Sequence, residues 1–313
     1  MKKTVLASTL TTLLFAGAAQ AATVYQDDSS SLDIGGRAEA RFNVSDNNKV
    51  GENGLPDGNS SFEDISRARI DIEGKTQIMP GLGAFGTYKM EVGSGGEESV
   101  DTRYLFAGID THYGAFSYGK QDSAQVILTD FTDILATFGG DAADLIDANS
   151  DELKNNFVYA GTFDALTITA NYIANDEKDS DNYGISFVYS LPMGLDIGVG
   201  YVDGQESDVD ADQVNLAGAY TYNDFYFAAI YTDGSLGEAD LKAYEIAAAY
   251  KINQLTLQGV YNFQENDSTD TVDYYALEGV YKFNSSFRAY AGYRFEQIDD
   301  LDDQVQAGVR YDF

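Results

Sequence analysis

Apolar and polar residues alternate with a period of two along most of this 313-residue chain. The run Leu32–Val44 shows it plainly: apolar or small residues occupy the even positions, and Arg37, Glu39 and Arg41 lie between them. Successive side chains of a β-strand point to opposite faces, so this run predicts a strand with one apolar and one charged face.

Fifteen further runs continue the pattern to the C-terminus, and the predicted elements are therefore about sixteen strands. These runs are Arg67–Glu73, Ala84–Val92, Arg103–Ile109, Ala115–Gln121, Asn156–Gly161, Leu166–Tyr172, Tyr183–Tyr189, Leu195–Tyr201, Val214–Tyr220, Phe227–Tyr231, Tyr244–Tyr250, Leu255–Tyr261, Tyr275–Tyr281, Phe287–Tyr293 and Val305–Phe313.

The connections between these runs alternate in length. Tight turns are expected at Asp110–Gly114, Thr162–Asp164, Leu191–Gly194, Tyr222–Asp224, Ile252–Gln254 and Phe283–Ser286. Longer polar loops are expected at Ser45–Ser66, Ala174–Asp181, Asp203–Ala211, Asp233–Asp240 and Phe263–Thr271. Short turns on one rim and long loops on the other are typical of outer-membrane barrels.

Charges of both signs in the middle of the polar faces suit a wet interior, whereas a soluble β-sandwich would bury the apolar faces as its core. No later segment approaches the roughly 20 apolar residues of a transmembrane helix. The sequence therefore predicts an all-β fold: a transmembrane antiparallel up-and-down β-barrel with apolar residues facing lipid and polar residues facing a water-filled lumen.

The segment from Gln121 to Lys154 breaks the alternation. It contains an apolar patch, a Phe138-Gly139-Gly140 break and eight acidic residues before its first Lys or Arg, which is Lys154. We interpret it as an insert that folds inside the barrel.

The chain begins with a targeting pattern. Lys2 and Lys3 precede the apolar run Thr4–Ala18, and Ala19-Gln20-Ala21 fits a signal-peptidase site. We expect residues 1–21 to be a cleaved signal peptide and residues 22–313 to form one barrel domain. The mature chain then carries 17 Lys and Arg against 51 Asp and Glu, a net charge of −34. That balance excludes nucleic acid and anionic membrane surfaces as main partners and suits divalent cations.

With its terminal Tyr311-Asp312-Phe313, the chain resembles the general diffusion porins of Gram-negative outer membranes. Leu32–Arg37 is similar to the first strand of that family. Thr132–Asp141, which includes Phe138-Gly139-Gly140-Asp141, is similar to its third-loop motif P-E-F-G-G-D. The resemblance implies a sixteen-stranded homotrimer with three pores, each narrowed by an inward-folded third loop whose acids face basic wall residues.

By position, the resemblance implies a constriction with Asp133 and Asp141 on the loop and Arg37, Arg69 and Arg103 on the wall. Arg41 and Arg67 share the lumen face by strand parity and join the candidate basic wall. Ala136 and Thr137 replace the Pro and Glu of the motif, so Asp144 or Asp147 is a candidate substitute for the missing acid. Small outward residues of the early strands indicate a subunit contact: Gly36, Ala38, Ala40, Ala68, Ala84 and Gly86.

The expected function is passive diffusion of small hydrophilic solutes and ions, with a preference for cations because of the acidic insert. The alternatives are a substrate-specific channel and an outer-membrane enzyme or adhesin. The single histidine, His112, lies in a predicted short turn, which argues against a catalytic triad or a His-rich metal site in the long loops. We expect no enzymatic activity, no cofactor and no metal site.

The remaining partners expected are outer-membrane lipid and lipopolysaccharide, with divalent cations as a candidate bridge. The acidic clusters Asp208-Val209-Asp210 and Asp299–Asp303 could bind Ca²⁺ in this way. They lack a defined calcium-loop motif, which favours solvated charge.

Overall fold

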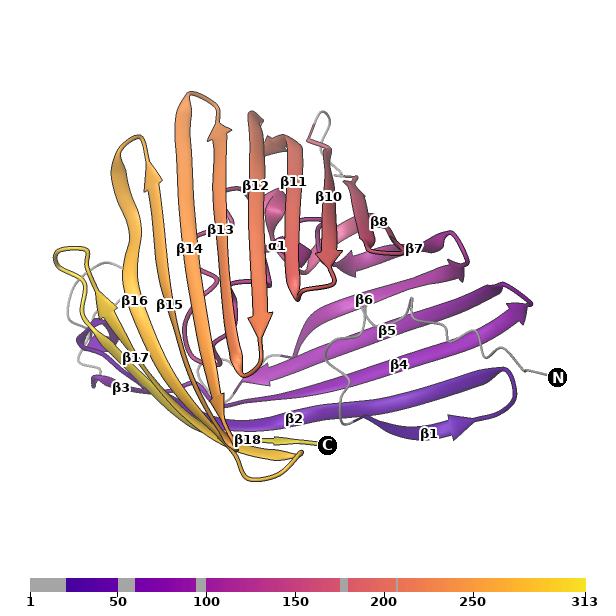
Figure 1. Cartoon of the computed structure of the whole chain (residues 1–313), viewed down its shortest axis with the longest axis horizontal. Coiled ribbons are helices and arrows are strands. Elements are labelled where there is room, and N and C mark those ends of the chain that lie inside the picture. Colours follow the sequence, from indigo (N-terminus) through magenta and orange to yellow (C-terminus); the bar gives the residue numbers. More distant parts are fainter. Residues whose placement is uncertain (1–20, 50–59, 94–99, 175–179, 207) are drawn as a thin grey trace.

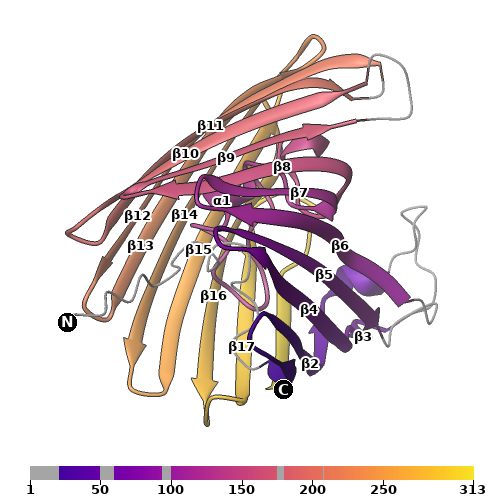
Figure 2. The same ribbon diagram turned by 90° about the vertical axis from the view of Figure 1, so that its right-hand side faces the viewer.

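The computed structural model describes residues 21–49, 60–93, 100–174, 180–206 and 208–313. The predicted signal peptide lies outside the described residues except for Ala21. Within the described ranges, sixteen antiparallel strands close into a barrel (Figures 1 and 2), as the alternation predicts. They are β2 (Ser30–Val44), β4 (Arg67–Met79), β5 (Leu82–Gly93), β6 (Val100–Thr111), β7 (Gly114–Gln121), β8 (Leu153–Phe163), β9 (Leu166–Ile173), β10 (Asn182–Leu191), β11 (Leu195–Glu206), β12 (Val209–Tyr222), β13 (Phe225–Leu236), β14 (Ala239–Ile252), β15 (Leu255–Asn266), β16 (Thr269–Lys282), β17 (Phe287–Glu296) and β18 (Gln304–Asp312).

The barrel closes where the last strand meets the first long one. β18 pairs with β2 in antiparallel register, and the backbone amides of Gly36 and Phe313 each donate to the carbonyl of the other residue at 2.9 and 3.0 Å. The short β1 (Ala22–Gln26) pairs with the start of β2, and the short β3 (Phe62–Asp64) pairs with its end. Closure leaves no long edge unpaired among the described strands, which a sheet in lipid requires.

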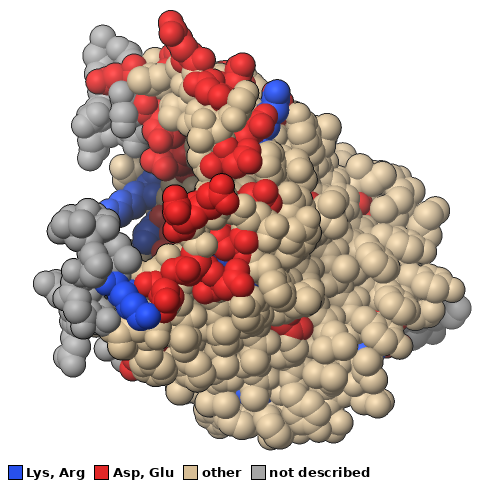
Figure 3. All heavy atoms as spheres, turned by 90° about the vertical axis from the view of Figure 1, so that its left-hand side faces the viewer, with Lys and Arg blue, Asp and Glu red and all other residues tan. Residues whose placement is uncertain are grey.

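The two faces of the wall differ as the period-two pattern predicts. Leu216, Ile246 and Leu277 point outward and are 52%, 52% and 59% exposed, whereas the inward Gln213 and Glu245 are fully buried. In Figure 3 the acidic side chains gather along the loop rim, and a broad part of the wall carries almost no charge. The described residues contain no helix that is long and apolar enough to cross a membrane.

The rim with the longer connections departs from the sequence prediction. The segments Asp203–Ala211, Asp233–Asp240 and Phe263–Thr271 are not long loops, because the flanking strands run on until only two residues remain between them. Positive φ angles at Asp208, Gly237, Asp267 and Ser268 fit tight hairpin turns. The polar residues of these segments lie on strands that extend beyond the apolar, lipid-facing belt. Their polarity therefore reflects exposure to solvent and does not mark a loop. The expected tight turns on the other rim are confirmed.

Candidate pore constriction

Residues Asp122–Glu152, here called the third loop, connect β7 to β8 and fold into the barrel. They contain only one short helix, α1 (Val126–Thr129), and one short 3₁₀ helix, η2 (Asp147–Asn149). Figure 2 shows α1 enclosed by the strands. Most of the loop backbone therefore needs hydrogen-bond partners outside regular structure.

Buried polar side chains of the wall supply many of these partners. The carboxylate of Glu245 on β14 accepts bonds from the backbone amides of Ala142 and Ala143, both at 3.0 Å, and from the hydroxyl of Thr132. Glu278 on β16 accepts from the amide of Ala136 at 3.0 Å. Wall amides and a phenol bind the loop in the same way: Gln258 to Ile134, Gln213 to Ala143, Gln264 to Ala142 and Tyr226 to Phe131.

Apolar side chains of the third loop, here called its apolar anchors, also pack against the wall. Phe138, which is 7% exposed, packs against lumen-facing alanines of β12, β13, β14 and β16: Ala219, Ala228, Ala247 and Ala276. Leu128 and Ile146 fill two similar clusters further along the wall. Small side chains on this sector of the lumen face make room for the loop, which therefore lies against β10–β17 and leaves the opposite sector open.

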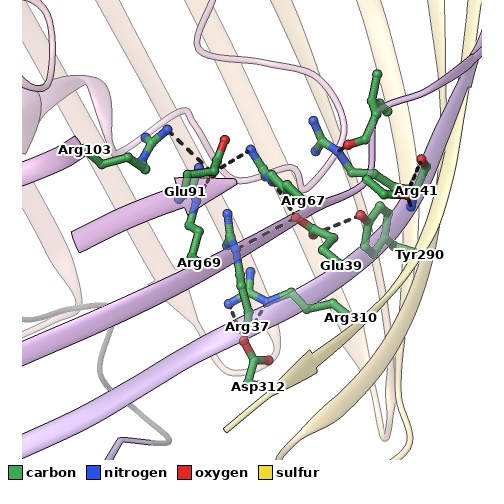
Figure 4. Close-up of polar contacts among 12 residues, drawn as sticks. Arg37, Glu39, Arg41, Arg67, Arg69, Glu91, Arg103, Tyr290, Arg310 and Asp312 are labelled. Carbon is green, nitrogen blue, oxygen red and sulfur yellow. Dashed lines mark hydrogen bonds and ion pairs between the residues drawn. The ribbon is translucent and has the colours of Figure 1, made fainter. Parts of the chain in front are cut away.

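The open sector carries the predicted arginines. Arg37 on β2 and Arg69 on β4 are opposite each other in the sheet register. Arg67 Nε donates to Glu39 at 2.7 Å, and Arg69 Nε donates to Glu91. Figure 4 shows these side chains projecting from adjacent strands. The partner carboxylates hold the guanidinium groups in place on the lumen face of the wall.

Arg103 joins this group through an irregularity of β6. The register between β5 and β6 shifts next to Lys89, so that Thr102 and Tyr104 face consecutive β5 residues and Arg103 is the extra residue of a bulge. Bulges redirect side chains. The Arg103 guanidinium lies 3.6 Å from Asp151 and 3.8 Å from Glu91 and also pairs with Glu152.

A cavity of about 450 Å³ separates this wall from the third loop. Its basic lining comes from Arg37, Arg69, Arg103, Lys89 and Arg310, and its loop lining includes Asp122, Asp130 and Asp151. Cations of the wall and carboxylates of the third loop therefore face each other across this cavity.

The acids predicted from the motif are not among the residues that line this cavity, and their role in the constriction stays a prediction. Asp141 accepts a bond from the Tyr274 hydroxyl at 2.6 Å and pairs with Arg294 on β17 at 3.3 Å. Asp133 is exposed beside the Gly139-Gly140 turn, where Gly140 has a φ of +69° and a Cβ would lie 3.1 Å from the Asp133 carboxyl carbon. Asp144 accepts from Asn149, and Asp147 begins η2 with its amide bonded to Glu206.

Some of the predicted basic residues line the cavity and others do not. Arg37, Arg69 and Arg103 line the cavity, and Arg67 lies 3.7 Å from Glu91 beside them. Arg41 Nε donates to the carbonyl of Ile65 at 3.0 Å and ties β2 to the β3–β4 junction. Lys154 lies on β8 and lines a separate cavity near the loop rim.

Sequence reasoning missed Asp122, Asp130 and Asp151 as lining residues, and Arg294 and Arg310 as wall cations. Strand parity places Arg294 and Arg310 on the lumen face, but it does not single them out as part of the site. The loop acids offered no such signal, because the loop has no period that assigns its side chains to a face.

Enclosure by the barrel and nearby carboxylates raise the pKa of several loop acids. The side chains of these acids keep contact with the lumen, but the protein atoms that surround them inside the barrel partly desolvate the carboxylates. This desolvation, then the charges of Asp122, Asp133 and Asp151, raises the pKa of Asp130 to about 7. Desolvation is also the main cause that raises the pKa of Asp144 to about 7 and that of Asp133 to about 6. The negative charge of the loop is therefore sensitive to pH near neutrality.

Among the described residues, we find no group of three or more His, Cys, Asp or Glu side chains arranged to hold a metal ion. Nothing in the lining of the cavity calls for a cofactor. A closed barrel with an apolar outside, a charged lumen and a loop folded into it defines a channel protein that spans a membrane with strands.

Comparisons with known proteins agree with this class. Residues 4–301 match the family model described as Gram-negative porin. Porin-like protein L of Photobacterium profundum is 37% identical over the full length of both chains, and outer membrane protein U of Vibrio vulnificus is 34% identical over the same extent. The chain belongs to the Gram-negative porin family.

Solved structures match the fold. The structure of Salmonella typhi OmpF in complex with daunomycin superposes with a TM-score of 0.80 at 20% identity, covering 92% of this chain and 99% of that one. The trimer form of Vibrio cholerae OmpT gives a TM-score of 0.70 at 18% identity, covering 91% and 100%. The protein is an outer-membrane porin, a channel for passive diffusion of small hydrophilic solutes.

Proposed function

We propose that this porin prefers cations and that its selectivity is set where the third loop faces the arginine wall. The observation that carries the proposal is the lining of the cavity, with Asp122, Asp130 and Asp151 opposite Arg37, Arg69 and Arg103. In this proposal Asp133, Asp141, Asp144 and Asp147 add negative potential from the same loop, and Arg41 and Arg67 support the wall. Fixed charges that line a pore bias which ions enter it.

Reversal potentials in planar bilayers under a salt gradient test the preference, and the expected sign is that of a cation-selective channel. A lining charge about 8 Å from a permeating ion in water contributes ~0.5 kcal/mol, which is about a factor of two in ion occupancy. At pH 9, where Asp130 is charged, Asp130→Asn should therefore lower the cation-to-anion permeability ratio about fourfold, because cation occupancy falls and anion occupancy rises by about twofold each. Arg69→Gln should raise the ratio by a similar factor. An anion-selective wild type would contradict the proposal.

We also propose that the channel assembles as a homotrimer through its early strands. A shallow outer groove there is lined by the small Ala38, Ala40 and Ala68 together with Val309. Small residues let apolar surfaces approach closely. The trimer form described for Vibrio cholerae OmpT supports the same assembly.

Ala68→Arg tests this contact, because it puts a charge into the groove. We expect the variant to run as a monomer in unheated detergent gels, whereas Leu216→Arg, on the far side of the barrel, should impair insertion instead of trimer formation. A fully trimeric Ala68→Arg protein would refute the assignment of the interface.

The proposed removal of residues 1–21 is tested separately by the intact mass of the protein purified from outer membranes, which should correspond to a chain that begins at Ala22.

A further inference from the structure

Three basic side chains form a row on the lumen face near the short-turn mouth: Lys282 on β16, Arg288 on β17 and Arg310 on β18. In the sheet register Lys282 is directly opposite Arg288, and Arg288 is directly opposite Arg310. Like charges placed directly opposite each other destabilise a sheet. Two such pairs in succession therefore lower the stability of the sheet unless negative charges neutralise them.

Nearby carboxylates neutralise this repulsion only in part. Arg288 donates to Asp312 at 2.8 Å, and Arg310 Nε donates to the same carboxylate at 2.6 Å. The Asp312 side chain is 8% exposed, so it is the buried counter-ion of both guanidinium groups. Within the described ranges we find no salt bridge for Lys282, nor for Lys251 at the same end of β14. Glu39 on β2 is directly opposite Arg310 in the sheet register, but it pairs with Arg67 and Arg37. Among the described residues, Asp312 is therefore the carboxylate that forms the salt bridges of this basic cluster.

The opposite ends of the same strands are acidic. The β15–β16 hairpin carries Glu265, Asp267 and Asp270, and the connection between β17 and β18 carries Asp299–Asp303. The potential along this sector therefore reverses from negative at the loop mouth to positive at the short-turn mouth. In outer-membrane barrels the short turns face the periplasm.

The basic row also borders the constriction. Arg310 and Asp312 line the same cavity as Arg37 and Arg69, and Figure 4 shows Arg310 beside Asp312 below the arginine wall. An anion held by the row would consequently lie next to the narrow part of the pore and would obstruct the ion current.

We propose that Lys282, Arg288 and Arg310 bind multivalent oxyanions with several phosphate groups that enter from the short-turn mouth. Guanidinium groups bind phosphate oxygens in a bidentate fashion, and an ammonium adds a point charge. Neighbouring strands place the three cations at intervals of about 5 Å, which suits an anion with several charged groups better than a monovalent one. The acidic loop mouth repels the same anion, so binding depends on the side of entry.

The test is current block by inorganic tripolyphosphate in planar bilayers, at matched ionic strength and without divalent cations. The sequence has no cysteine, so Met193→Cys in an exposed short turn reports the orientation of the channel to an impermeant thiol reagent. We expect block from the short-turn side at a concentration at least tenfold lower than from the loop side.

The paired substitution Lys282→Gln with Arg288→Gln should weaken this block at least fivefold and remove the difference between the two sides. Arg288→Lys, which keeps the charge, should retain most of the block. Lys242→Gln, at the loop end of β14, is the matched control and should leave block unchanged. A folded-barrel band in unheated detergent gels verifies that each variant folds. Equal block from both sides, or undiminished block in the doubly substituted channel, would overturn the proposal.

Discussion

Asp130 illustrates how the position of a single residue decides its chemistry here. Its carboxylate is exposed to the lumen, yet the barrel wall and the neighbouring acids raise its pKa to about 7. A raised carboxylate pKa means that the neutral form dominates below that value and the charged form above it. The same holds for Asp144, with a pKa of about 7, and for Asp133, with a pKa of about 6.

A pH-dependent selectivity follows. Between pH 5 and pH 9 these loop acids gain negative charge, so the cation-to-anion permeability ratio should rise, with most of the change between about pH 6 and pH 8. Asp130→Asn should flatten part of this rise, whereas Asp164→Asn in a short turn should leave it intact. Reversal potentials across that range measure the effect, and a flat wild-type profile would count against titration of the loop.

At the residue scale, strand parity predicts that Arg37, Arg67 and Arg69 share the lumen face, and in the structure they pair with Glu39 and Glu91 of the same wall. Their role in the constriction stays a prediction. Arg103 obeys no alternation, because it sits in a bulge, and only the resemblance to porins pointed to it. For the loop acids the motif named Asp133 and Asp141, whereas the cavity is lined by Asp122, Asp130 and Asp151.

At the scale of elements, the third loop depends on the wall for its shape. A loop with so little regular structure keeps one conformation only if its backbone groups find fixed partners. Glu245 is the most connected of these partners: it is fully buried and accepts three bonds, from Thr132, Ala142 and Ala143.

Glu245→Ala should therefore loosen the loop. Each buried donor left without an acceptor costs about 1–3 kcal/mol, unless water replaces the carboxylate. We expect more frequent brief closures and greater open-channel noise in single-channel records. Glu238→Ala, in the tight hairpin turn between β13 and β14, is the matched control. A Glu245→Ala channel as quiet as the wild type would show that the apolar anchors alone fix the loop.

The substitution Phe138→Ala tests how much these apolar contacts stabilise the protein. Truncation of a buried Phe typically costs roughly 3–5 kcal/mol through lost burial and the cavity left behind. Because Phe138 fills a pocket of alanines on the barrel wall, the loss should lower the midpoint of thermal unfolding. Ile298→Ala, in the connection before β18, provides a comparison outside these clusters, and equal midpoints for the two variants would contradict the anchoring role.

At the scale of the whole molecule, the barrel inverts the usual arrangement of a folded protein. Large apolar side chains cover the outside, while buried Gln, Asn and Glu side chains line the inside and bond to the loop. The outer surface is stable only in contact with lipid, so the fold and its location in the outer membrane are linked.

Two substitutions test which side chains face lipid and which face the lumen. Leu277→Arg puts a charge on the lipid face in the middle of β16 and should destabilise the inserted barrel by roughly 2–4 kcal/mol. Gln306→Arg puts the same charge on the lumen face of β18, where water can solvate it, and should have a much smaller effect. Urea unfolding in lipid vesicles measures both, and similar losses would mean that the assignment of faces is wrong.

The sequence by itself determined the sixteen strands, the face of each regular strand position and the place of the inserted loop. It could do so because a strand's period of two is a local property that each side chain reports independently. Its prediction of long loops after β11, β13 and β15 is wrong, because polar residues indicate exposure to solvent and do not show where a strand ends.

Only the tertiary structure decided which carboxylates face the arginines, which wall residues hold the third loop, and which cations become neighbours across strands. The path of the loop depends on hydrogen bonds and apolar contacts with strands more than a hundred residues away, as between Thr132 and Glu245. The row of Lys282, Arg288 and Arg310 likewise exists only through sheet register. Such long-range pairings leave no period in the chain, so they emerge only when the barrel closes.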